Sequence, residues 1–411
     1  MLYARLNRNI SKIFLIVGCQ SFILAYVIER IFALERGLSI LEMQYILIIY
    51  STTSLILEVP FGVLADKWKK KYVLSLGIFF CCFEFFISIY AYSFTVFSLA
   101  FLLAAIGGSL KSGIMDSILF ETLKGIKRES EFEKFKGYVN LLKYMTSGIA
   151  GIVGGYVAYY YGLEYSYWFS LFGLILAALV SLTLYEPVAL SNKPTEDEGS
   201  KLNSFILHIM TSVKIVRSKP GLFQVMIYGS IIGAILYGQL HEMSSIIYPD
   251  IGIPLSHFGY ISLTITLFGG LAGVWAYKVR EKLGYVTTFG MILGISIISI
   301  YLYSEATMWW HVVYLVVAIF MMELVSPLTA GYVHHRIEDQ YRVTISSLDS
   351  FLINALTILV SLLFGYVAEQ WSIYVAYKMM AMILMVYGVF IVMLKIKSRV
   401  RGGASSVRQG V

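Results

Sequence analysis

Apolar runs of roughly 20 residues recur along this chain, and each is long enough to cross a lipid bilayer as a helix. Apolar residues make up 58% of the 411 residues and charged residues only 14%. A soluble chain typically carries about 25% charged residues, so a soluble protein of this composition could not cover its surface. Lipid offers the backbone no hydrogen-bond partner, and a helix satisfies its own. We therefore predict an all-α integral membrane protein with twelve transmembrane helices, near residues 12–33, 43–64, 72–92, 95–121, 137–161, 165–185, 222–247, 257–278, 285–304, 308–333, 343–368 and 373–394.

The loops between these runs alternate in charge. Basic residues gather before the first run and after each even-numbered run, as in 67–71 and 124–136, whereas Arg36 is the one clear basic residue of the odd loops. Cytoplasmic loops are enriched in Lys and Arg, so we predict that both termini are cytoplasmic. The expected location is the bacterial cytoplasmic membrane. Because the net charge of +7 follows this parity, we expect the lipid bilayer, not nucleic acid, as its partner.

One long polar stretch divides the chain into two halves. It lies at about 188–220 and separates six predicted spans in 1–187 from six in 221–396, with a basic cytoplasmic tail at 397–411. We interpret the stretch as a solvated linker. Its later part places apolar residues at helical spacing among basic ones, which predicts an amphipathic helix at the cytoplasmic interface.

The loop after the second run carries a recognisable motif, Gly62-x3-Asp66-Lys67-x2-Lys70-Lys71. It resembles the signature loop between helices 2 and 3 of the major facilitator superfamily (MFS), except that a lysine stands at position 69 where glycine is usual. The resemblance implies two pseudo-symmetric six-helix bundles and a conformational latch at Gly62 and Asp66. We expect Lys67 and Lys70 to assist that latch or to act only as topological charge. Glu58 would brace the cytoplasmic gate.

Stretches in both halves resemble bacterial efflux-type members of the superfamily, which exchange drugs for protons. These stretches are 34–39, 112–124 and 336–348. Two departures exist: residues 150–155 lack the proline that antiporters typically carry, and Lys111 stands where they often have arginine.

Charges inside the predicted spans are the main candidates for mechanism. A charge at the bilayer centre costs at least about 2.5–3.5 kcal/mol on insertion scales, so each needs a partner, water or a function. By resemblance, the first, fourth, seventh and tenth helices line a central cavity. Their candidates for proton coupling and substrate binding are Glu29, Arg30, Lys111, Asp116, Gln239, His241, Glu242 and Glu323.

We rank Asp116 first for proton coupling, on a helix face shared with Gly108 and Ser112, and then Glu29 and Glu242. A structural ion pair is an equally good interpretation of any single one. Glu84, in the third span, is a second-tier candidate.

Small residues form one face of the fifth span. Gly151, Gly154 and Gly155 lie on that face with Ser147, and small residues let helix backbones approach closely. The resemblance implies that this face abuts the eighth helix as a sliding seal, and static packing explains the glycines equally well.

Together these features predict a secondary active transporter that works by alternating access. The leading hypothesis is proton-coupled export of amphipathic or cationic small molecules by a monomer, with the proton gradient in place of any cofactor. The alternative is a proton-coupled symporter that imports a polar metabolite. We expect no enzyme activity and no metal site, because the spans show neither a nucleophile–base pair nor metal-ligand spacing, and no phosphate-binding loop of ATP-driven pumps occurs.

Overall fold

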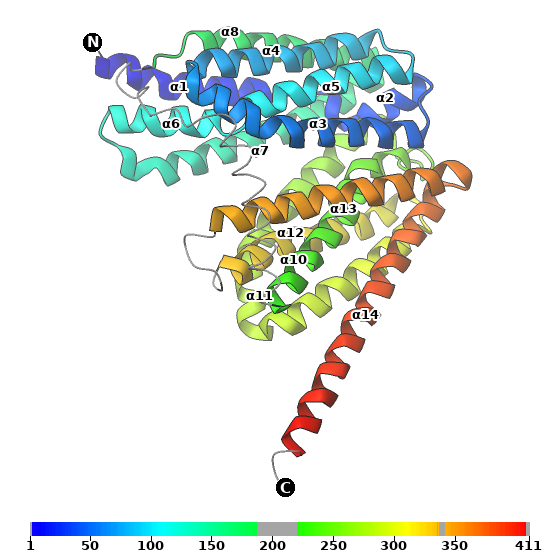
Figure 1. Ribbon diagram of the computed structural model, residues 1–411. Coiled ribbons are helices and arrows are strands. Elements are labelled where there is room, and N and C mark those ends of the chain that lie inside the picture. The colour runs from blue at the N-terminus through cyan, green and yellow to red at the C-terminus, as the bar shows by residue number, and fades with distance from the viewer. Residues whose placement is uncertain (1, 187–219, 335, 337–341, 408–411) are drawn as a thin grey trace.

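The computed structural model describes residues 2–186, 220–334, 336 and 342–407, and all of its regular elements there are helices (Figure 1). The expected linker at 188–219, with its amphipathic helix, lies outside the described residues. The N-terminal half holds α1 (Leu2–Ser21), α2 (Glu29–Glu35), α3 (Ile40–Lys67), α4 (Lys70–Ile89), α5 (Phe94–Lys111), α6 (Ile114–Gly125), α7 (Phe132–Tyr161) and α8 (Leu163–Leu182). The C-terminal half holds α10 (Pro220–Ile232), η4 (Gly233–His241), α11 (Leu255–Tyr303), α12 (Val312–His334), α13 (Arg342–Gln370) and α14 (Ile373–Val407). α14 continues as one helix past residue 396, where the sequence placed the start of a separate tail.

Ten helical segments among the described residues are long and apolar enough to cross a membrane. Two expected spans, 137–161 and 257–278, are not among the ten, although both are helical within α7 and α11. Segment 257–278 contains residues 270, 273 and 274, whose side chains lie outside the described part of the chain. α11 also joins two expected spans across a break at Gly284, where φ is 73°. The count of twelve spans stays a prediction.

The halves are two bundles that meet along two pairs of helices. Within the N-terminal half, α4 packs on α5 and α8, and α1 packs on α8; within the other half, α11 packs on α12 and α14. Between the halves, α7 packs on α11 and α3 packs on α13. Figure 1 shows the halves as separate bundles, drawn in blue to green and in green to red.

The two ends of the bundles differ in charge. We call the end that carries 67–71 and 124–136 the basic side, and the end that carries 22–39 and 242–254 the outer side. On the outer side, Arg36 is the exception in the charge pattern, and it is only 8% exposed. Its guanidinium pairs with Glu164 and lies 4.0 Å from the Tyr92 ring centroid. Packing within the N-terminal half therefore explains why this one basic residue occurs on the outer side.

The face of α7 that carries small residues contacts two different segments. A Cβ at Gly155 would lie 2.7 Å from the Leu255 carbonyl oxygen of α11, and one at Gly259 would lie 2.3 Å from the Gly151 carbonyl oxygen. Gly154 instead faces its own half, where a Cβ would lie 2.2 Å from the Leu24 carbonyl oxygen. These glycines therefore allow three close backbone contacts, two of them between the halves. The sliding of this seam stays a prediction.

Three of the helices that were expected to line the cavity are irregular. The first span breaks between Ser21 and Glu29, with a short 3-10 helix η1 (Ala25–Val27) in the gap. The fourth span stops at Lys111 and restarts at Ile114, through Gly113 at φ 69°. In the seventh span, η4 is a π-helix of nine residues. Irregular backbone within a span is tolerated where protein or water satisfies it, and π-helical turns are frequent at functional sites.

A methyl group at Gly259 should disturb the seam between the halves. The atoms that it would meet are backbone atoms of α7 at 2.3–2.4 Å, which cannot rotate away. Overpacking of this kind costs about 1–3 kcal/mol, so Gly259→Ala should lower the thermal midpoint of the purified protein. Gly290→Ala is the matched control on the same helix, because nothing lies within 4 Å of that Cβ position. Equal midpoints for the two variants would contradict a tight seam.

Candidate functional site

Arg30 connects the two halves on the outer side. Its Nη2 donates to Glu242 Oε2 at 2.8 Å, and its Nε donates to the Glu242 carbonyl oxygen at 3.3 Å. Its Nη1 lies 2.7 Å from Glu29 Oε1. Arg30 is 7% exposed, so a nearly buried guanidinium is neutralised by one carboxylate from each half.

Broken helices place these groups. α2 begins at Glu29, after the gap in the first span, so Glu29 and Arg30 occupy a new first turn. η4 ends at His241, directly before Glu242. His241 Nδ1 lies 3.6 Å from Glu242 Oε1. A cavity of about 10 Å³ beside Glu29 and Arg30 is lined by residues of the N-terminal half and is close to the volume that one water needs.

A second group of polar residues lies inside the N-terminal half. Glu84 of α4 is 8% exposed and makes no hydrogen bond or ion pair with any residue that the structure describes. The charges that act most strongly on the Glu84 carboxyl group are those of Glu29, Lys111 and Arg30. Lys111, at the end of α5, lies close enough to the thiol of Cys81 for the two groups to interact. The expected second-tier candidate therefore belongs to the same charge cluster as Glu29 and Arg30.

A third group lies in the C-terminal half. The Tyr237 and His241 rings stack with centroids 5.2 Å apart and planes within 6°. Glu323 of α12 is half-buried, and its charge acts on both of these residues. Tyr237 also interacts with Tyr50 of α3 in the other half. This group therefore borders the space between the halves.

Two of the expected cavity residues lie elsewhere. Asp116 is paired with Lys136 of α7 near the basic side, and its side chain is 46% exposed. It does not continue the face of Gly108, because the helix breaks between Lys111 and Ile114. Gln239 is fully buried and donates to Ser361 of α13 at 2.8 Å. The π-helix changes which residues share a face, so Gln239 points into its own half while Glu242 faces Arg30.

The expected latch is described only in part. The side chains of Glu58, Asp66 and Lys67 lie outside the described residues. At Gly62 a Cβ would meet nothing within 4 Å, so no close helix contact at Gly62 is seen among the described residues. Lys70 pairs with Glu121 and donates to Ser117 at 2.5 Å, both on α6. Its contacts are therefore within the N-terminal half, and the latch stays a prediction.

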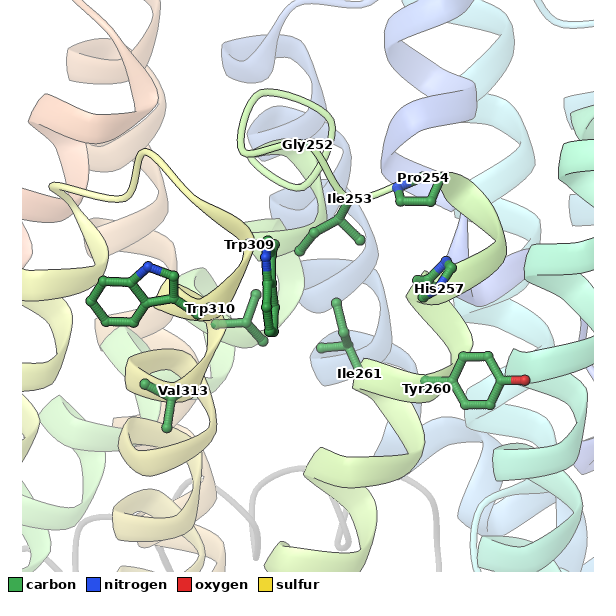
Figure 2. A pocket seen from close by; sticks show the side chains of 10 residues that line it. Gly252, Ile253, Pro254, His257, Tyr260, Ile261, Trp309, Trp310 and Val313 are labelled. Carbon is green, nitrogen blue, oxygen red and sulfur yellow. The ribbon is translucent and has the colours of Figure 1, made fainter.

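A larger cavity shares no residue with these charged groups. It has a volume of about 750 Å³ and lies between the outer ends of α11 and α12 (Figure 2). Its walls are mostly apolar, with Trp309 and Trp310 on one side and His257 and Tyr260 on the other. Tyr260 also contacts Tyr156 of α7, with hydroxyl oxygens 3.2 Å apart. No charge in a span faces this cavity, so we do not place the ion chemistry there.

The bond from Arg30 to Glu242 should hold the outer side closed. In Glu242→Gln, Arg30 keeps Glu29 as its counter-ion, so the protein should still fold. Loss of a charged hydrogen bond is worth about 1.5–3 kcal/mol, which predicts a shift of about tenfold or more toward an outer-open state. Spin labels at Glu35 and Gln370, in a cysteine-free background, would report this as a longer distance across the outer side.

A matched control for that experiment is Glu305→Gln. Glu305 pairs with Lys378 at 2.7 Å, also on the outer side but wholly within the C-terminal half. Removing this pair should leave the label distances unchanged. If Glu242→Gln and Glu305→Gln gave the same distance distribution, the bond from Arg30 would not control closure.

Comparison with known proteins agrees with this architecture. Residues 12–354 match the Major Facilitator Superfamily. The chain is 26% identical to an uncharacterized MFS-type transporter of Methanocaldococcus jannaschii over 282 residues, covering 68% of this chain and 69% of that protein. It is 22% identical to the inner membrane transport protein YajR of Escherichia coli, covering 64% of this chain and 55% of YajR.

A solved structure of similar fold is that of the nucleoside transporter NupG. Its TM-score is 0.68 at 14% identity, covering 96% of this chain and 99% of NupG. The likeness to NupG shows the fold alone. The match over 12–354 decides the family, and proteins of this family are membrane transporters, not enzymes. This chain belongs to the major facilitator superfamily.

Proposed function

We propose that this chain is a proton-coupled exporter of cationic or amphipathic small molecules that works by alternating access. The observation that carries the proposal is the charge balance between the two halves. Four carboxylates (Glu29, Glu84, Glu242 and Glu323) stand near two basic side chains, Arg30 and Lys111, and one histidine, His241.

An excess of carboxylates in a membrane has to be neutralised, because unpaired charge there is costly. Arg30 serves Glu29 and Glu242 together. Lys111 lies near the thiol of Cys81, and Glu84 and Glu323 keep no ion pair among the described residues. A proton on one carboxylate and a substrate cation beside another each supply missing positive charge, so binding of one makes binding of the other less favourable. Competition of this kind links the movement of protons to the movement of cations.

Among the four carboxyl groups, Glu84 is the best candidate for binding the transported proton. It is nearly buried, so a bulky cation has little access to it. It also lies close enough to Glu29 and Arg30 for its charge to act on them. Protonation of Glu84 would therefore change the charge balance around the bond that holds the outer side closed.

Alternating access needs contacts that form in one state and break in another. The inter-half hydrogen bonds among the described residues, Arg30–Glu242 and Tyr156–Tyr260, both lie on the outer side. With the termini in the cytoplasm, as the loop charges predict, this arrangement corresponds to a state closed to the outside. Export would then begin with substrate entry from the cytoplasm.

The alternative is a symporter that imports a polar metabolite with a proton. Its support is Lys111, a cation that could bind an anionic or polar group, together with the fold likeness to a nucleoside transporter. The two hypotheses predict opposite responses to a pH gradient.

Proteoliposomes distinguish the two functions. With an acidic lumen, an antiporter should accumulate ethidium, a permanently charged cation, as protons leave. Nigericin, which collapses the gradient, should abolish the accumulation. A symporter should accumulate uridine or a dipeptide only when the outside is acidic. Ethidium flux that does not depend on the pH gradient would contradict proton-coupled export.

Substitution of Glu84 tests its role as the proton-binding group. Glu84→Gln should reduce gradient-driven ethidium accumulation by about tenfold or more, since the exchangeable proton is lost, while gradient-free ethidium exchange persists. Asp116→Asn is the matched control, because Asp116 is paired with Lys136 away from the cluster. If Asp116→Asn lost proton coupling and Glu84→Gln retained it, Asp116 and not Glu84 would be the proton-binding group.

A further inference from the structure

We infer that Glu323, Tyr237 and His241 form the subsite that binds the positive charge of the substrate, and that its ligand is an organic cation with aromatic or bulky apolar substituents. We call these three residues the cation subsite. The inference rests on the proposed function, since it assigns the substrate's place in the same transport pathway.

Glu323 provides the negative charge. It lies within α12, is half-buried, and forms no ion pair with any residue in the described part of the chain. The other acid of the C-terminal group, Glu242, is already engaged by Arg30. Glu323 is therefore the carboxylate of this half that is available to a ligand.

Tyr237 and His241 provide an aromatic wall beside that charge. Their rings stack one helical turn apart, and Tyr237 is 54% exposed although it lies in the middle of a span. A cation over an aromatic face gains about 0.5–2 kcal/mol, more where water is excluded. A carboxylate and an aromatic face together favour a cation that is large and weakly hydrated over a small inorganic ion.

The subsite faces the space between the halves. Tyr237 lies close enough to Tyr50 of α3 for the two to interact across that space. A ligand at the subsite would therefore lie near Tyr50 of the other half. It would also lie beside His241, which contacts the Glu242 carboxylate that holds Arg30.

Gly269 of α11 sets the position of Glu323. A Cβ at Gly269 would lie 3.1 Å from Glu323 Cγ and 3.5 Å from its Cδ. The carboxylate stem therefore packs directly on the helix backbone. An alanine at this position would displace the carboxylate without changing any charge.

Equilibrium binding of tetraphenylphosphonium to the purified full-length protein in nanodiscs tests the inference, with no gradient present. Triphenylphosphine oxide, a neutral molecule of similar shape, competes as the reference ligand. The wild type should prefer the cation, and Glu323→Gln should weaken its binding by about tenfold or more with little effect on the neutral competitor. Tyr237→Leu should also weaken cation binding, whereas Tyr237→Phe, which keeps the ring, should not.

Three controls separate binding from folding. Glu323→Asp keeps the charge and should retain most of the cation preference. Glu305→Gln removes an acid of the outer side that already has Lys378 as partner, and should change nothing. Gly269→Ala should lower affinity through displacement of Glu323. All variants should elute as the wild type does in size-exclusion chromatography.

Several results would overturn the cation subsite. They are absence of tetraphenylphosphonium binding to the wild type, unchanged binding in Glu323→Gln, or loss of binding in Trp309→Ala alone, which would place the ligand in the cavity of Figure 2. The proposed function fails separately. If cation binding depends on Glu323 but proteoliposomes show no gradient-driven flux, proton-coupled export is contradicted and the cation subsite is retained. Gradient-driven flux together with unchanged tetraphenylphosphonium binding in Glu323→Gln overturns the cation subsite and leaves proton-coupled export.

Discussion

The neutralisation of Arg30 is the constraint on which the rest of this structure depends. A guanidinium keeps its charge at any physiological pH, and it cannot stay unpaired in a membrane. One half supplies Glu29 and the other supplies Glu242, so the same bonds that neutralise the charge also tie the two bundles together on the outer side. A structural need thereby becomes a conformational contact, because the halves cannot separate there without exposing Arg30 or giving it a new partner.

Helix irregularities make that contact possible. The gap before Glu29 and the π-helix that ends at His241 bring the ends of two helices toward each other. The glycine seam between α7 and α11 lets the backbones touch on the same side of the molecule. Rigid bundles, one close seam and one inter-half ion bridge are the elements that a two-state transporter requires. In the proposed function, the remaining carboxylates, Glu84 and Glu323, bind the proton and the substrate cation.

The sequence predicted much of this arrangement because the energetic cost of a buried charge can be read without a structure. It indicated an all-helical membrane protein and singled out Glu29, Arg30 and Glu242, which the structure brings together. It could not show that Asp116 lies apart from them, since the break at Gly113 depends on a backbone conformation that a continuous apolar run conceals. For the same reason it placed Gln239 among the cavity residues, whereas in the π-helix Gln239 points into its own half. Tyr237 and Tyr50 carried no signal among 31 tyrosines, because only their surroundings in the fold distinguish them.

The central claim is that protons and substrate cations compete for the same group of carboxylates. Such coupling is reciprocal, so cation binding must displace protons. The most direct measurement is the release of protons when tetraphenylphosphonium is added to the purified protein in weakly buffered solution with a pH indicator. The account predicts proton release that rises with the amount of bound cation and saturates with it. Saturable cation binding without proton release, at every pH at which the protein stays folded, would contradict it.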